Sequence, residues 1–435
     1  MGKFSLPPSA FACCGVALAI WFAGCERPPE MRAAQSGDAA ALRRAIIAKE
    51  RTATLSNRAA ADLARVVASR DVRRSNGADA VARVGSVGSC ALKLDDALAA
   101  RMAIHDAAGA LAAVMRVDQG TLSPERVRSY GADPMGDWRA VGARGLVRSE
   151  DDRAREHAFQ DRDPTVRRQA IRASRDARAR SDMPYLVHAA RTDPDPTIQT
   201  EAVRALGALP SPPPDRTLVD ALRDIWASSS EDLRGEVAWA WSRSDLWNAG
   251  GREALRFVIE TGHGSAVGEA AAAVLRRSDA DKALVSDAVV RLTEVIANAP
   301  TGSRLHAIAE APSDHATVMD AISAAARDGD PAVRVAALGR LAQAGRRSAT
   351  TELEALAQPG ESTSRQARMA LAIAGDRRVQ GWLEQSLEAA DARERLEAAV
   401  GLVRLGLAAR AAPLLADSDA DVRMRAACEI LMSRP

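Results

Sequence analysis

Residues 163–174 are DPTVRRQAIRAS and residues 195–206 are DPTIQTEAVRAL, so one pattern recurs after 32 residues. Both stretches start with Asp-Pro-Thr and an aliphatic residue, and an alanine follows four positions after that residue. A fixed period of about 20 to 50 residues is typical of stacked repeats, because each unit buries its apolar face only against its neighbours. The two stretches therefore predict a repeat array if further copies follow.

Further copies continue to the end of the chain when the aliphatic residue is numbered zero. DPAVRVAALGRL (330–341) and DADVRMRAACEI (419–430) fit closely, and weaker copies fill the intervals between them. Successive plus-four positions lie 28 to 36 residues apart and are occupied by Ala170, Ala202, Val237, Ala271, Ala307, Ala337, Ala367, Ala398 and Ala426. Nine units in one register predict a repeat array over this part of the chain.

Each unit has the pattern of two helices joined by a short turn. Positions zero, four, five and eight share one side of a helix, and a small residue at plus four allows a neighbouring helix to approach closely. Asp and Pro at minus three and minus two start this helix, because the carboxylate caps free backbone N–H groups and proline tolerates the first turn. A second helix precedes it, as at 184–191 and 315–326. The expected fold is all-α, a right-handed α-solenoid of stacked antiparallel helix pairs.

The pattern resembles the HEAT repeat, and in its Asp-x-x-Val-Arg-x-x-Ala core the PBS-lyase-like variant of that repeat. The resemblance covers residues 135–435, with a tenth copy at Trp138, Arg139 and Leu146. It implies that the second helices line the concave side. It also implies that the plus-one arginines bond to aspartates of adjacent repeats; these are Arg167, Arg334, Arg395 and Arg423, whereas Gln199 and Ser364 depart from the pattern.

The N-terminus has the features of an export signal. Met1 and Lys3 precede the apolar run FACCGVALAIWF, and the following FAGC resembles a bacterial lipobox, which would make Cys25 the lipidated first residue. An ordinary secretory signal cut after Ala19 is one alternative, and an uncleaved span is another, although the apolar run is shorter than the roughly 20 residues that a span needs. We expect a signal peptide at 1–24, a lipidated tether at 25–32 and a bacterial envelope location.

Residues 33–134 are helical in pattern but irregular, and they are either divergent repeats or an N-terminal cap ahead of the array at 135–435. Two cysteines lie outside the signal and tether, Cys90 and Cys428. An oxidising envelope would permit a disulfide between them. Because they lie near opposite ends of an elongated solenoid, we expect two separate thiols.

Composition and motifs offer little support for catalysis or nucleic-acid binding. Of 435 residues, 59 are basic and 57 acidic, so net charge gives no argument for a nucleic-acid partner. The sequence has no His-Glu-x-x-His, Walker-type or Gly-x-Ser-x-Gly motif, and its six histidines are not at metal-ligand spacing. We therefore expect no catalytic residue, cofactor, metal or small-molecule substrate.

Tryptophan and arginine residues at and near plus six are the candidate partner-binding residues. Trp239, Arg172 and Arg204 occupy plus six in successive units, and Arg168 belongs to the arginine-rich stretch 166–182. Trp and Arg are favoured anchors of binding hot spots. Local packing of Trp239 and a solvated arginine face are the simpler alternatives, whereas Trp241, at plus eight, is expected in the core. A partner would offer acidic or aromatic groups to residues 166–245.

These features together predict a lipid-anchored envelope scaffold that binds a protein or peptide and catalyses no reaction. An enzyme subunit of the bilin-lyase-like class is one alternative, because PBS-lyase-like repeats occur in phycobilin lyases. A purely architectural envelope protein is another. Repeat resemblance implies fold rather than activity, so neither the scaffold nor its alternatives follow from the repeats alone.

Overall fold

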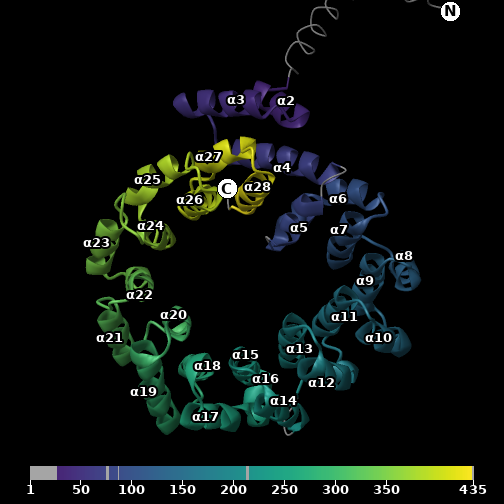
Figure 1. Cartoon of the computed structure of the whole chain (residues 1–435), viewed down its shortest axis with the longest axis vertical. Coiled ribbons are helices and arrows are strands. Elements are labelled where there is room, and N and C mark those ends of the chain that lie inside the picture. The colour runs from purple at the N-terminus through teal and green to yellow at the C-terminus, as the bar shows by residue number, and fades with distance from the viewer. Residues whose placement is uncertain (1–26, 75–77, 87, 212–214, 434–435) are drawn as a thin grey trace, which may run out of the picture.

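The computed structural model describes residues 27–74, 78–86, 88–211 and 215–433, which contain helices and no strand. The helix pairs are arranged in a closed ring with an inner and an outer layer (Figure 1). The inner layer consists of α5 (Ala78–Ser86), α7 (Ala107–Asp118), α9 (Gly136–Gly145), α11 (Pro164–Ala177), α13 (Pro196–Ala208), α15 (Glu231–Trp241), α18 (Gly264–Leu275), α20 (Thr301–Glu310), α22 (Pro331–Gln343), α24 (Ser364–Ile373), α26 (Ala392–Arg404) and α28 (Ala420–Met432).

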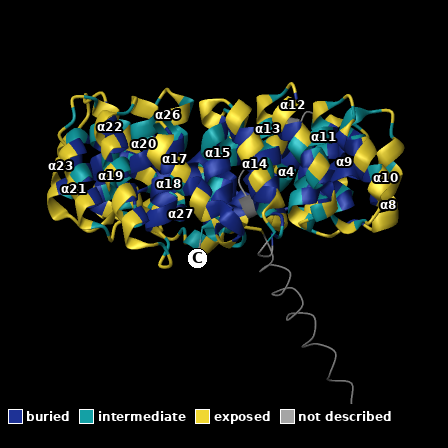
Figure 2. Ribbon diagram, turned by 90° about the horizontal axis from the view of Figure 1, so that it is seen from below, coloured by how far each residue is buried: buried dark blue, intermediate teal, exposed yellow. Residues whose placement is uncertain are grey.

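The outer layer alternates with the inner one along the chain. It consists of α4 (Asn57–Arg73), α6 (Asp95–Met102), α8 (Pro124–Ser129), α10 (Asp152–Phe159), α12 (Met183–Thr192), α14 (Thr217–Ser228), α17 (Arg252–Thr261), α19 (Lys282–Asn298), α21 (Ala316–Ala325), α23 (Arg347–Leu356), α25 (Gln380–Ser386) and α27 (Ala408–Ala411). Seen on edge, the ring has exposed residues along both rims, where the loops lie (Figure 2).

Burial confirms the register of the repeats. All nine plus-four residues are at most 2% exposed, and the helices that carry them form the inner layer from α11 to α28. Small residues allow these helices to approach closely, as expected. At Gly207 in α13, an added Cβ would lie only 2.9 Å from the Cβ of Ala240 in α15. The periodic pattern therefore predicted which face of each helix packs against its neighbours.

The predicted helix starts are also confirmed. Asp163, Asp195 and Asp330 are the N-cap residues of α11, α13 and α22. In each case a side-chain oxygen accepts a hydrogen bond from the backbone N–H two residues later, at 2.8 to 2.9 Å. These bonds satisfy donors that a helix N-terminus otherwise leaves free.

Arginine–aspartate bonds join successive units at three of the four plus-one arginines, as the resemblance implies. Among the described residues, Arg334 instead donates only to the carbonyl of Asp328. Arg167 donates to both carboxylate oxygens of Asp193 at 2.8 and 3.0 Å, and Arg395 bonds to Asp417 in the same way at 2.7 and 3.0 Å. Each arginine also donates to the carbonyl six residues before it. Gln199, which departs from the pattern, keeps only the carbonyl bond, at 2.8 Å to Asp193.

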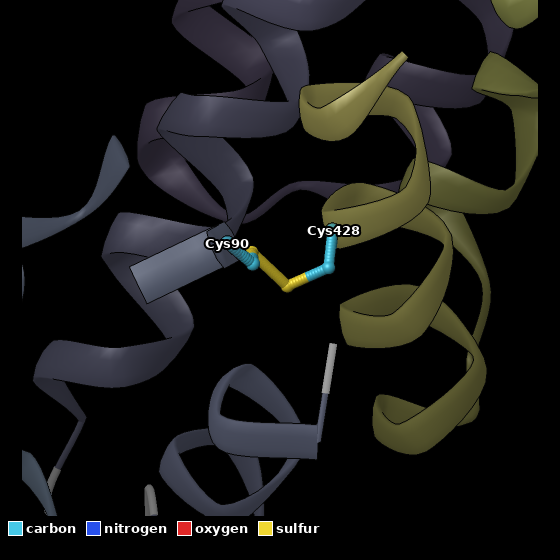
Figure 3. The surroundings of a disulfide bond; sticks show 2 residues. All are labelled: Cys90 and Cys428. Atoms are coloured by element: carbon cyan, nitrogen blue, oxygen red, sulfur yellow. A yellow bond between two sulfur atoms is a disulfide. The ribbon is translucent and has the colours of Figure 1, made fainter. Parts of the chain in front are cut away.

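The two ends of the repeat array meet, which sequence reasoning did not predict. Cys90 and Cys428 form a disulfide, with an Sγ–Sγ distance of 2.10 Å and a Cα–Cα distance of 5.4 Å (Figure 3). The prediction of two separate thiols is therefore wrong. Its premise was an elongated solenoid, whereas the helix pairs curve until α28 lies against α4 and α5.

Polar contacts at this seam reproduce those between ordinary neighbours. Arg423 Nε of α28 donates to Asp71 Oδ2 of α4 at 2.7 Å, which is the plus-one arginine bond of the array. Asn57 Nδ2 donates to the carbonyl of Gly406, and Asn57 Oδ1 accepts from the N–H of Ala409, each at 2.9 Å. The N-terminal helices thus occupy the place of the next repeat after α28.

Two helices lie outside the ring, beside the seam (Figure 1). These are α2 (Pro29–Ser36) and α3 (Ala39–Arg51), whose Glu30 and Lys49 form an ion pair. Residues 29–32, assigned to the tether, belong to α2, because Pro29 fits the first helical turn. In the part of the chain that the structure describes, every helix is too short or too polar to cross a membrane.

Candidate partner-binding surface

The inner layer carries a pocket of about 890 Å³, which we call the acidic pocket. Residues of α13, α15, α18 and α20 line it, so four successive units contribute to one concave surface. Its charged lining residues are Arg204, Glu231, Asp232, Glu236, Glu269, Arg276, His306 and Glu310. Five carboxyl groups therefore face two guanidinium groups and one imidazole, which leaves the pocket with net negative charge.

The basic groups of the acidic pocket are paired with carboxylates across adjacent units. Arg204 Nε donates to Glu236 at 2.8 Å, and Arg276 forms an ion pair with Glu310. His306 Nε2 lies 2.9 Å from Glu269 Oε2. The hydrogen bond to Glu269 raises the pKa of His306 above its usual value, since a nearby carboxylate favours the protonated ring.

Two acidic residues at the start of α15 have no such basic partner. Among the described residues, no arginine, lysine or histidine forms an ion pair with Glu231 or Asp232. Glu231 Oε1 accepts a hydrogen bond from the backbone N–H of Ser265 at 3.2 Å. The uncompensated charge of the pocket is therefore concentrated at the N-terminal end of α15.

The two candidate tryptophans of α15 have different surroundings. Trp239 is half-buried and lines the acidic pocket, with the guanidinium carbon of Arg243 5.8 Å from its ring centroid. Trp241 is 1% exposed, packs against Trp226 and donates from Nε1 to the carbonyl of Val219. The expectation that Trp241 belongs to the core is confirmed, and the structure places the ring of Trp239 at the pocket wall.

The candidate arginines are bound to carboxylates of the following unit. Arg172 Nη2 donates to Glu201 at 2.7 Å, and Arg168 Nη2 donates to Asp195 at 3.0 Å. Of the three candidate arginines, Arg168, Arg172 and Arg204, only Arg204 lines the acidic pocket with Trp239. An acidic partner would have to compete with these internal bonds. A sequence signal for them existed, because Glu201 and Glu236 both occupy plus three, one unit after an arginine at plus six.

An adjoining concavity of about 570 Å³, which we call the apolar groove, was missed by sequence reasoning. Residues of α20, α22 and α24 line it, mainly with aliphatic side chains, and Glu397 of α26 (Ala392–Arg404) completes the lining. Ile373 at its border is 52% exposed, which is unusual for isoleucine. Helix α20 serves both sites, since His306 faces the acidic pocket and Ile308 lines the apolar groove.

Other chemical features are limited. No group of three or more His, Cys, Asp or Glu side chains in the described ranges is arranged to hold a metal ion. Cys25, the predicted lipidation site, lies outside the described residues. The main features that the inner layer offers a ligand are therefore an acidic pocket with one tryptophan and an apolar groove beside it.

Comparison with known proteins agrees with this architecture. Residues 152–242 match a family model described as HEAT repeats, and the matched segment runs from α10 to the end of α15. No curated protein matches the chain. The match and the ring of stacked helix pairs together support a HEAT repeat protein, and the chain is an all-α, HEAT-like solenoid.

Proposed function

We propose that this protein is a lipid-anchored scaffold of the bacterial cell envelope that holds a protein or peptide partner against the inner layer of its ring. The observation that carries the proposal is the pair of adjoining concave sites, about 890 and 570 Å³, on consecutive inner helices. HEAT repeats commonly mediate protein interactions, which supports a protein partner in general. The scaffold performs no reaction of its own in this proposal.

The lipid anchor rests on the sequence around Cys25 and its resemblance to a lipobox. Each buried methylene group contributes about 0.8 kcal/mol to membrane binding, so two or three acyl chains would hold the protein stably at a membrane surface. The disulfide between Cys90 and Cys428 supports export as well, because disulfides persist mainly in oxidising compartments.

The two arginines of the acidic pocket are already paired with carboxylates of the following unit, Arg204 with Glu236 and Arg276 with Glu310. The bilin-lyase-like alternative predicts a bound or transferable pigment. A visible absorption spectrum of purified protein, alone and after incubation with a linear tetrapyrrole, separates the two functions.

Site-specific photo-crosslinking in cells tests the scaffold proposal. A photoreactive phenylalanine analogue replaces Met369, which lines the apolar groove of the inner layer, or Phe257, a 48% exposed residue of the outer helix α17. We expect one defined crosslinked species from position 369 and none from position 257. Equal crosslinking from both positions, or none from either, would contradict a partner held on the inner layer.

A further inference from the structure

We infer that the partner segment is a peptide in which arginine or lysine residues adjoin a run of aliphatic residues. The basic residues occupy the acidic pocket, and the aliphatic residues occupy the apolar groove. This inference rests on the proposed function, and it adds the chemistry of the partner and the direction in which it lies along the inner layer.

The acidic pocket selects a basic group. Its two arginines are already bound to carboxylates, whereas Glu231 and Asp232 have no basic partner among the described residues. A concave site with a net charge of one sign attracts groups of the opposite charge. The ring of Trp239 lines the same pocket, and aromatic faces attract guanidinium and ammonium groups. A phosphate or an acidic peptide would meet repulsion here.

The apolar groove selects aliphatic side chains. Its accessible apolar side chains include Leu305, Met369 and the exposed Ile373, and Met adapts its shape easily to a bound apolar group. The two arginines at its border already have acceptors, since Arg365 pairs with Asp391 and with Glu397, which also lines the groove. Arg340 Nε donates to the carbonyl of Ala311 at 3.1 Å. Burial of aliphatic groups therefore provides the main source of affinity in the groove.

The two sites lie on either side of α20, so one ligand that crosses this helix reaches both. Helix α20 contributes His306 and Glu310 to the acidic pocket, and it contributes Leu305 and Ile308 to the apolar groove. A segment lying along the inner layer from α15 to α24 therefore meets negative charge first and apolar surface next. This order specifies a partner with its basic residues on the α15 side.

The probe is a fluorescein-labelled synthetic peptide with three arginines followed by six residues that alternate leucine and serine. Its binding to the full chain in mild detergent is measured by fluorescence anisotropy, beside one peptide with glutamates for arginines and another with serines for leucines. We expect the arginine–leucine peptide to bind at least about tenfold more tightly than either control, with affinity that falls as salt rises.

Matched double variants locate the binding. Glu231→Gln with Asp232→Asn removes two charges from the acidic pocket, and Glu253→Gln with Glu260→Gln removes two from the exposed surface of the outer helix α17. The pocket variant should bind the peptide about tenfold more weakly, with an unchanged circular dichroism spectrum. The outer variant should bind like the unaltered chain. Ile373→Glu, at the groove, should also weaken binding.

Three results would overturn the inference. They are stronger binding of the glutamate peptide, equal losses in the two double variants, and no binding of any probe peptide. If no probe peptide binds but position 369 still crosslinks to a partner in cells, the assigned chemistry of the partner is wrong and the scaffold proposal stands. If no peptide binds and position 369 forms no crosslink, the scaffold proposal is wrong as well.

Discussion

Two alanine substitutions in α15 separate a residue that packs the array from one that is proposed to bind a partner. Trp241 is 1% exposed, and its ring centroid lies 5.6 Å from that of Trp226. Removing a fully buried aromatic side chain typically costs about 3–5 kcal/mol, because the cavity is only partly refilled. Trp241→Ala should therefore lower the free energy of unfolding by about that amount.

Trp239→Ala should change peptide affinity more than it changes the free energy of unfolding. It is half-buried at the wall of the acidic pocket, so its loss opens no enclosed cavity and should cost about 1 kcal/mol of stability. Truncating an aromatic binding anchor costs on the order of 2 kcal/mol, which corresponds to about thirtyfold in affinity. Trp239→Ala should weaken binding of the arginine–leucine peptide by that factor.

Urea unfolding followed by circular dichroism measures stability, and anisotropy at a urea concentration where both variants remain folded measures binding. If Trp239→Ala destabilises the ring as much as Trp241→Ala, Trp239 belongs to the packing between units. If it leaves peptide affinity unchanged, the acidic pocket does not use its aromatic ring.

The remaining predictions concern anchoring, packing and pH. Cys25→Ser should leave a longer, unacylated precursor in a radiolabelled palmitate assay, and normal acylation of that variant would refute the lipobox. Ala398→Leu should cost about 1–3 kcal/mol by overpacking, whereas Arg393→Leu, whose side chain is 76% exposed, should change little in thermal unfolding. Burial raises the pKa of Glu50 to about 7, against the opposing charge of Arg410. The folded state then binds more protons than the unfolded chain between about pH 4.5 and 7, so stability should fall as pH rises through that window. Glu50→Gln should flatten this dependence in unfolding measured from pH 5 to 8, and an unaltered slope would contradict the assignment.

The repeated helix pattern was predictable because it depends on neighbours close in sequence. Ala170, Ala202 and the other plus-four residues had to be buried, and all but Val237 are alanine, so that adjacent helices can pack. The N-cap role of Asp163 followed from its place before Pro164. These features follow from local chemistry and one repeat length, so a single sequence was enough to predict them.

Ring closure was not predictable in the same way. Curvature accumulates from a small rotation per unit, which is set by side-chain volumes at each joint rather than by the repeat pattern. The sequence of the N-terminal helices also does not reveal that they pair with α28. Asp71 accepts a hydrogen bond from Arg423, although it lies in no recognisable copy of the repeat pattern. The disulfide between Cys90 and Cys428 depends both on this curvature and on the packing of the N-terminal helices against α28.

The candidate site was predicted in part. The sequence identified Trp239 and Arg204, which do line one pocket, but not the carboxylate of Glu236 that holds the arginine. That carboxylate belongs to the next unit and to a different column of the repeat. Reading a single column along the chain therefore predicted a basic surface where the assembled wall is acidic.

Mass spectrometry of the unreduced, alkylated protein tests the closed ring most directly. Closure predicts a disulfide-linked pair of tryptic peptides that contain Cys90 and Cys428, which are 338 residues apart in sequence. By the chain-entropy model, a crosslink over so long a loop stabilises the folded state by about 6 kcal/mol, so the oxidised protein should also resist urea better than the reduced one. Recovery of both cysteines as alkylated free thiols from freshly isolated protein would contradict the ring.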